Sequence, residues 1–292
     1  MDLNYLYILL PIICWPLATV LLTKFSRNKW SLQTVLYRQI TIFLVWIPLL
    51  FLISKTDILL IQENLLSVFL ASFFWSIYIF SVFMAFDYLP IWISRVFTIT
   101  SRLLLSLFIW YFVLFENIWL IDLLWLIVLL LWFYLLSKDK INNLHLKKKN
   151  IFFWIIISLA NWILFGLSIY FFKIYSSGVN PLVSAYILES IDIILLSIFA
   201  LIFSIKNNKN YFKIGKNDFI KILLISPIAL LWTYWLAKSY DYISFYIINI
   251  LFVFIFFSSL ILAYFILWEK ITRKQLLSMF IIMLTTSIII LF

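Results

Sequence analysis

The sequence contains little charge and very little glycine, cysteine or histidine. Only 12% of its 292 residues are Asp, Glu, Lys or Arg, about half the share in ordinary globular proteins. A single cysteine, Cys14, excludes an internal disulfide framework and a cysteine-rich metal site. No glycine-rich phosphate loop, histidine cluster or nucleophile with a base stands out among the residues. These absences argue against metal chemistry and ATP hydrolysis, and we expect neither a cofactor nor enzyme activity.

Apolar residues are abundant instead, at 66% of the chain with a mean hydropathy of +1.14. This composition excludes a fold with a single core surrounded by water. A membrane-spanning helix needs about 20 mostly apolar residues, and the runs are continuous rather than alternating as in barrel strands. The sequence therefore predicts an all-α integral membrane protein with ten transmembrane helices, at about 5–22, 34–53, 65–86, 91–113, 119–136, 151–172, 181–204, 219–238, 242–267 and 275–292.

The net charge of +10 comes mainly from Lys and Arg in short loops between the apolar runs. That placement is typical of residues that set membrane topology and contact anionic lipid, and it gives no basic stripe for nucleic acid. Most of these cations fall in alternate loops, on one side of the membrane. The positive-inside rule places that side in the cytoplasm, so we expect a plasma (inner) membrane protein with both termini outside.

The most basic loop divides the chain into two halves of five spans each. We expect a first repeat at 1–140, a basic linker at 141–150 and a second repeat at 151–292. Each half contains an Asp-Tyr pair followed by a Glu at nearly the same spacing, Asp87 to Glu116 and Asp241 to Glu269. Because each half has an odd number of spans, the repeats must be inverted, an arrangement typical of secondary transporters.

Several short motifs carry a family resemblance. Tyr37-Arg38 begins the second span, and Phe115-Glu116-Asn117-Ile118 and Trp268-Glu269-Lys270-Ile271-Thr272 close the fourth and ninth. Together with the ten spans, they resemble the EamA-like family of the drug/metabolite transporter superfamily. The chain departs from that pattern where Phe115 and Trp268 replace the usual glycine before the Glu. The resemblance implies a cavity surrounded by spans one, three, four, six, eight and nine, and termini in the cytoplasm, unlike the charge pattern.

Ionisable and polar residues inside the spans are the candidate site. Arg95 and Arg102 lie seven residues apart in span four, hence on nearly one helix face, and arginine binds carboxylate or phosphate in bidentate fashion. Asn161 and Asn249 need hydrogen-bond partners at membrane depth. The alternative is that these groups only pair with neighbouring helices. Aromatic residues on the expected cavity helices could hold a ligand or simply pack; they are Trp15, Trp75, Tyr78, Trp162, Trp232, Tyr234 and Trp235.

Glu189 and Asp192 in span seven are three residues apart and therefore share a helix face. Two such carboxylates in a low-dielectric setting do not both ionise easily without a nearby arginine. One of them could load and release a proton, or both could form a structural ion pair with Arg38 of span two.

These patterns predict a secondary transporter that moves a small polar or amphipathic metabolite by alternating access. The arginines favour an organic anion or a zwitterion such as an amino acid, with protons as a candidate coupling ion and the lipid bilayer as the surroundings. Two alternatives remain open. The chain could flip a lipid-linked head group, or it could be an intramembrane enzyme or a non-transporting assembly subunit. The pattern does not indicate an oligomeric state.

Overall fold

The structure is a computed structural model of the chain, and it describes residues 6–27, 31–89, 91, 94–95, 98, 124, 127–128, 131, 148–239, 242, 248, 251–269 and 272–291. All regular structure in these residues is helical. The elements are α1 (Leu6–Ser26), α2 (Ser31–Trp46), the 3-10 helix η2 (Ile47–Leu52), α3 (Lys55–Glu63), α4 (Leu65–Tyr88), α7 (Lys148–Ser176), α8 (Pro181–Asn207), α9 (Lys216–Ile225), α10 (Pro227–Ser239), α12 (Val253–Leu267) and α13 (Arg273–Leu291).

Five helical segments are long and apolar enough to cross a membrane: Ser31–Leu52, Leu65–Tyr88, Ile155–Ser176, Pro181–Asn207 and Lys216–Ser239. They coincide with the predicted runs 34–53, 65–86, 151–172, 181–204 and 219–238, so the prediction of an all-helical, membrane-compatible chain is confirmed. The runs 5–22, 242–267 and 275–292 overlap shorter apolar helices, Leu10–Ser26, Val253–Leu267 and Leu276–Thr285. The runs 91–113 and 119–136 fall almost entirely outside the described residues.

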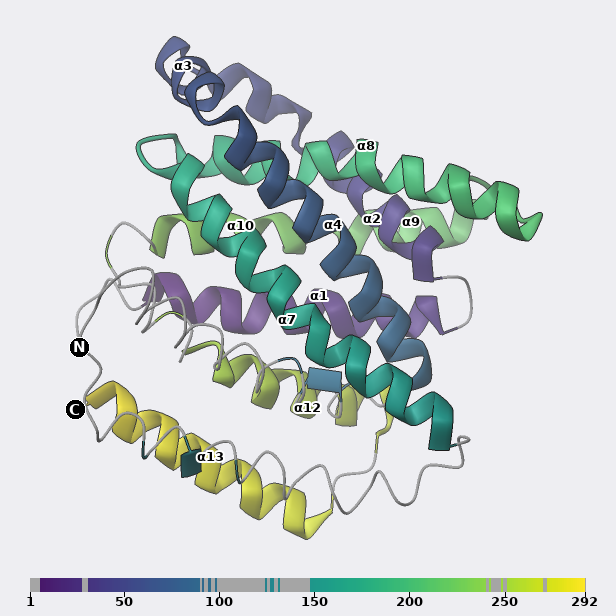
Figure 1. The fold of residues 1–292 in the computed structure, drawn as a ribbon, viewed down its shortest axis with the longest axis vertical. Coiled ribbons are helices and arrows are strands. Elements are labelled where there is room, and N and C mark those ends of the chain that lie inside the picture. The colour runs from purple at the N-terminus through teal and green to yellow at the C-terminus, as the bar shows by residue number, and fades with distance from the viewer. Residues whose placement is uncertain are drawn as a thin grey trace.

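Successive long helices run in alternating directions and pack as a bundle. In Figure 1, α4 and α7 lie side by side across the front, α1 passes behind them, and α13 lies at one edge. Small buried residues allow close helix approach where lipid gives no hydrophobic drive for association. At the α4–α7 contact, Ser168 donates a hydrogen bond to the Ala71 carbonyl at 2.9 Å, and both residues are fully buried.

Local signals in the sequence explain where several helices begin and end. Ser54 and Asp57 form a capping box at the start of α3, which satisfies backbone N–H groups that the helix itself leaves unpaired. Asn180 caps α8, with Pro181 in the first turn. Gly178, in the turn before α8, adopts a φ of +78°. Two helices end at a residue with left-handed backbone: α8 at Asn208 (φ 50°) and α12 at Trp268 (φ 58°).

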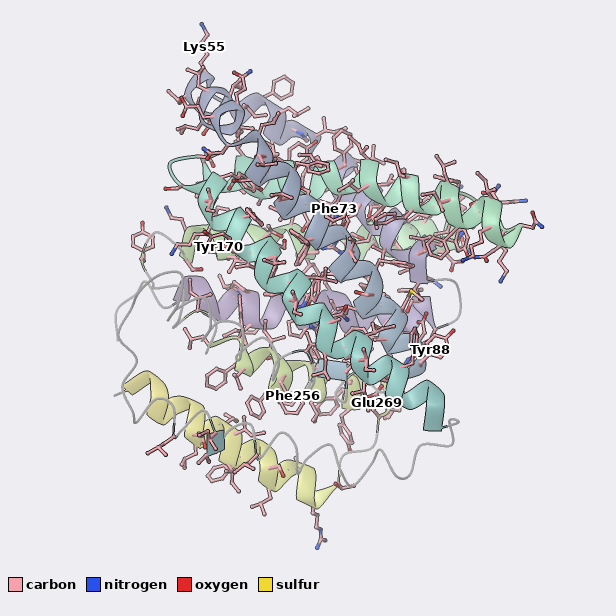
Figure 2. All side chains as sticks on the ribbon, in the orientation of Figure 1. Lys55, Phe73, Tyr88, Tyr170, Phe256 and Glu269 are labelled. Carbon is pink, nitrogen blue, oxygen red and sulfur yellow. The ribbon has the colours of Figure 1, made fainter. Side chains whose placement is uncertain are left out.

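The bundle has two ends, which Figure 2 distinguishes by labelled side chains: Lys55 lies at one end, and Tyr88 and Glu269 lie at the other. We refer to them as the Lys55 end and the Glu269 end. Loops far apart in the sequence meet at the Glu269 end, because Arg27 contacts Glu269 and Gln33 donates to the Lys213 carbonyl. This end also holds the basic residues that terminate α1 and α8 and begin α9 and α13: Lys24, Arg27, Lys206, Lys216 and Arg273.

Candidate functional site

Arg95 is buried in the centre of the bundle, with 2% of its surface exposed. Its Nη2 donates to the Thr19 hydroxyl of α1 at 3.1 Å, and the guanidinium also donates to Tyr78 of α4. The guanidinium carbon lies 5.7 Å from the Trp15 ring centre and 5.2 Å from that of Phe86. Among the described residues, no carboxylate lies within ion-pair distance of Arg95. The arginine is thus surrounded by neutral and aromatic groups.

An aromatic cage stands beside Arg95, and we define it as Trp15, Trp75, Tyr78, Phe165 and Trp232. The rings come from α1, α4, α7 and α10, so the cage joins four helices. Trp75 and Trp232 stack at 5.3 Å with 10° between their planes, and Trp15 lies 5.0 Å from Trp232 and 5.5 Å from Trp75. Tyr78 meets Phe165 edge-on at 4.8 Å. Each ring is buried, and the contacts give offset and edge geometries that aromatic pairs prefer.

A small enclosed cavity lies between Arg95 and this cage. Its volume is about 10 Å³, and its walls are Trp15, Tyr78, Arg95, Thr98, Phe165, Trp232, Phe252 and Ile255. That space holds about one water molecule. Two polar atoms of wall residues are buried without a hydrogen-bond partner in the structure, Nε of Arg95 and Nε1 of Trp232. Both atoms are donors, so the cavity is electropositive and suited to an acceptor.

The structure brings together only some of the residues predicted for substrate binding. Trp15, Tyr78, Arg95 and Trp232 line the cavity, and Trp75 stacks behind them. Asn161 is buried on α7, where its side-chain oxygen accepts from Ser81. The side chains of Tyr234 and Trp235 are partly exposed, pack on one another at 4.9 Å and do not line this cavity. Arg102, Asn249 and the Trp162 side chain lie outside the described residues.

A second polar cluster also contacts Trp15, through Arg38, and we call it the acid cluster: Arg38, Gln39, Ser76, Glu189, Asp192 and Thr233. All six side chains are buried. Arg38 and Glu189 form an ion pair, with Nη1 3.2 Å from Oε2. The structure thus places the predicted trio of Arg38, Glu189 and Asp192 together. It joins α2, α4, α8 and α10 at one point.

Hydrogen bonds from neutral groups complete the acid cluster. The Gln39 amide nitrogen donates to Glu189 Oε2 at 2.6 Å and to Asp192 Oδ2 at 2.9 Å. Thr233 donates to Glu189 at 2.8 Å, and Ser76 donates to Asp192 at 2.9 Å. Sequence reasoning missed Gln39, Ser76 and Thr233. Gln39 follows Arg38 directly in an apolar helix, and that adjacency was the available signal.

The cavity and the acid cluster share structural elements. The Trp15 ring lies 5.7 Å from the guanidinium carbon of Arg38 and 5.7 Å from that of Arg95. On α10, Trp232 forms a cavity wall while the adjacent Thr233 binds Glu189. A movement of α1 or α10 therefore affects both groups at once.

Polar contacts link the helices at the Glu269 end of the bundle, around an open pocket of about 410 Å³. Arg27 pairs with Glu269 at 2.7 Å and donates to the Phe86 carbonyl at 3.2 Å. The Asp87 carboxylate accepts from Ser26 at 2.7 Å and from Ser31. Because α12 ends in the left-handed conformation at Trp268, the chain turns back, and the N–H of Glu269 reaches the Ala263 carbonyl at 3.3 Å. These contacts tie α1, α2 and α4 to the segment after α12.

A carboxylate also links helices at the Lys55 end. Asp57 accepts from the backbone N–H of Asn180 at 2.9 Å and from the hydroxyl of Ser54 at 2.6 Å. Burial acts to raise the pKa of Asp57, but these hydrogen bonds and one from the Ser54 N–H outweigh it and lower the pKa below the usual 3.8. The contact links the start of α3 to the start of α8, so carboxylates form interhelical contacts at both ends of the bundle.

The described residues contain no group of three or more His, Cys, Asp or Glu side chains that could hold a metal ion. Comparison with known proteins shows no matching protein-family model and no matching curated protein. One solved structure, titled only "Crystal structure of protein", is similar to this chain with a TM-score of 0.69 and 13% sequence identity. The match covers 98% of this chain and 95% of that one. At this identity the likeness shows that the two chains share a fold.

Proposed function

We propose that the chain is a secondary transporter that moves a small organic anion across a membrane by alternating access. The observation that carries the proposal is Arg95, a buried arginine with no carboxylate partner among the described residues, beside a cavity with unpaired N–H donors. A buried cation is costly unless it is paired or has a function. An anionic ligand supplies the missing acceptor, and the aromatic cage supplies apolar walls.

The small size of the cavity and the contacts at both ends of the bundle fit a carrier between its open states. A cavity of about 10 Å³ is too small for an organic molecule. Contacts at Arg27–Glu269 and Asp57–Asn180 hold the two ends. Opening one end at a time, with the other held, exposes Arg95 to each side in turn. Such movement of helices around a fixed central site is how many secondary transporters work.

The architecture that we propose is ten helices in two inverted five-helix repeats, as in a divergent EamA-like member of the drug/metabolite transporter superfamily. The fold likeness over nearly the whole chain is compatible with it. The alternating directions of the described helices support it as well. Labelling of single cysteines in the loops and at both termini of a Cys14→Ser protein tests the proposal, because ten spans place both termini on one side. Termini on opposite sides would exclude it.

The two alternatives find less support in the described residues. An apolar groove of about 410 Å³ lies between α2 and α8, where a lipid chain could sit. Arg95 is not among its lining residues, so it does not connect the anion site to lipid as a flippase would require. The acid cluster brings an arginine and two carboxylates together, as the active site of an enzyme would, but all three side chains have an exposed fraction of 1% or less. None of the three is among the lining residues of the described cavities.

Uptake into proteoliposomes tests the transport proposal. The labelled probes are p-aminohippurate, glutamate, tryptophan and glucose 6-phosphate, which share an acceptor-rich anionic group and differ in size and aromatic character. We expect at least one to move, and Arg95→Gln to slow it at least about tenfold because a charge-assisted hydrogen bond is lost. Arg273→Gln, at an exposed arginine in the first turn of α13, is the matched control. Failure of all four probes, or wild-type rates in Arg95→Gln, would contradict the proposal.

A further inference from the structure

The acid cluster contains one more carboxylate than it has cations. Helices α2, α4, α7 and α10 contact α8, which carries the acids, and the groups that face the acids are Arg38, Gln39, Ser76, Tyr175 and Thr233, with Trp15 packed on Arg38. Tyr175 donates its hydroxyl to the Ser184 carbonyl at 2.8 Å. Among these groups, Arg38 alone carries a positive charge. With both acids ionised, the buried cluster would have a net charge of −1.

The two acids are also close together. Both accept from the same Gln39 nitrogen, at 2.6 and 2.9 Å, so those two oxygens lie within about 5.5 Å of one another, where like charges repel strongly in a low dielectric. Glu189 accepts from Arg38, Gln39 and Thr233, whereas the described donors to Asp192 are the neutral Gln39 and Ser76. The negative charge of Asp192 is therefore stabilised less by its neighbours than that of Glu189.

We propose that the acid cluster is a proton-binding site, in which Asp192 holds one proton in the closed bundle and exchanges it with water when α2, α8 and α10 separate. In the protonated form, Asp192 is neutral and Arg38 balances Glu189. The protonated carboxyl can donate to the Ser76 hydroxyl and reverse the bond seen with the carboxylate. The transfer consists of a proton taken up from water on one side and returned to water on the other.

The position of Trp15 gives the direction of coupling, and this step depends on the transport function proposed above. Arg38 and Arg95 each lie 5.7 Å from the same ring, and they are therefore within about 11 Å of each other. An anion bound at Arg95 is repelled by a deprotonated cluster of charge −1 and not by a protonated one. At an effective dielectric constant near 20, this difference is on the order of tenfold in affinity. Because coupling is reciprocal, the proton and the anion travel together, as in a symporter.

Infrared spectroscopy of the full chain in lipid nanodiscs tests the proton site without any ligand. A protonated carboxyl has a C=O stretching band that a carboxylate lacks. We expect such a band at neutral pH in the wild type and its loss in Asp192→Asn. Glu63→Gln, at an exposed acid on α3, should keep it. No band, or a band that survives both Asp192→Asn and Glu189→Gln, would overturn the proton site and leave the transport proposal intact.

Proteoliposomes test the coupling. With an acidic outside, wild-type protein should accumulate labelled p-aminohippurate, or whichever of the four probes moves in the uptake assay, while Asp192→Asn should still exchange that probe but lose accumulation driven by the pH gradient. Glu189→Gln is the second variant if Asp192→Asn does not fold. Accumulation by Asp192→Asn equal to that of the wild type would overturn the coupling. A carboxyl band without movement of any of the four probes would contradict the transport and coupling proposals and support the proton site alone, which separates the two failures.

Discussion

Replacement of Arg38 by methionine should destabilise the protein severely. Arg38 is fully buried, donates to both oxygens of Glu189 at 3.2 and 3.5 Å, and lies over the Trp15 ring. Methionine fills a similar volume but leaves Glu189 and Asp192 with neutral donors alone. Breaking a buried ion pair by removing one partner typically costs about 3–5 kcal/mol. At about 2 °C per kcal/mol for a chain of this size, the melting temperature should fall by roughly 6–10 °C.

Thermal unfolding followed by fluorescence-detected size exclusion measures this effect. The exposed Arg273→Met is the control and should change little, because surface cations contribute about 0–1 kcal/mol. The double variant Arg38→Met with Glu189→Gln should recover much of the loss, since a single remaining acid is easily kept neutral. Their coupling energy follows from a double-mutant cycle. If Arg38→Met melts within about 2 °C of the wild type, or if the double variant shows no recovery, the electrostatic account of the cluster is wrong.

Three further predictions concern the helix ends and the α4–α7 contact. Trp268→Asn should raise the melting temperature by a few degrees, because Trp268 is 81% exposed and holds a φ of 58° that asparagine tolerates better; a lower value would refute this. Asp57→Asn should lower the free energy of unfolding by about 1 kcal/mol at pH 7. The pKa of Asp57 is lowered in the folded protein. Its contribution to the free energy of unfolding is therefore fully present above pH 3.8 and is lost as the pH falls through the folded-state pKa. The variant and wild type should therefore converge in acid. Ser168→Val should destabilise more than Ser168→Ala, because it adds bulk as well as removing the bond to Ala71, and equal melting temperatures would contradict tight packing there.

The helical segments could be predicted because lipid leaves the backbone few options. A polar backbone in a bilayer must satisfy its own hydrogen bonds, so long apolar runs such as 65–86 and 181–204 become helices whatever their detailed sequence. The helix α4 ends at Tyr88 and α8 ends at Asn207, two and three residues after the predicted ends at 86 and 204. Composition and run length were enough for this level of description.

The identity of the site residues depended on helix rotation, which run length does not reveal. Asp192 and Glu189 share a face by spacing, but only the packing of α2 and α4 brings Gln39 and Ser76 to them. Aromatic residues were harder to assign, since 21% of the chain is aromatic. On α10, Trp232 faces the cavity while Tyr234, two residues later, points about 200° away around the helix. A continuous apolar run gives no periodic signal to separate the two.

Trp15 explains how the proposed anion site and the proposed proton site can coexist in one small bundle. Two buried guanidinium groups at close range would repel each other and destabilise the bundle, and the Trp15 indole offers each of them a favourable cation–π contact. The same ring packs on Trp75 and Trp232, so its position depends on α4 and α10. If α10 moves when the bundle opens, the cavity widens. The same movement changes the hydrogen bond from Thr233 to Glu189. Coupling between the two sites then follows from packing, and it requires no residue that contacts both the proton and the anion.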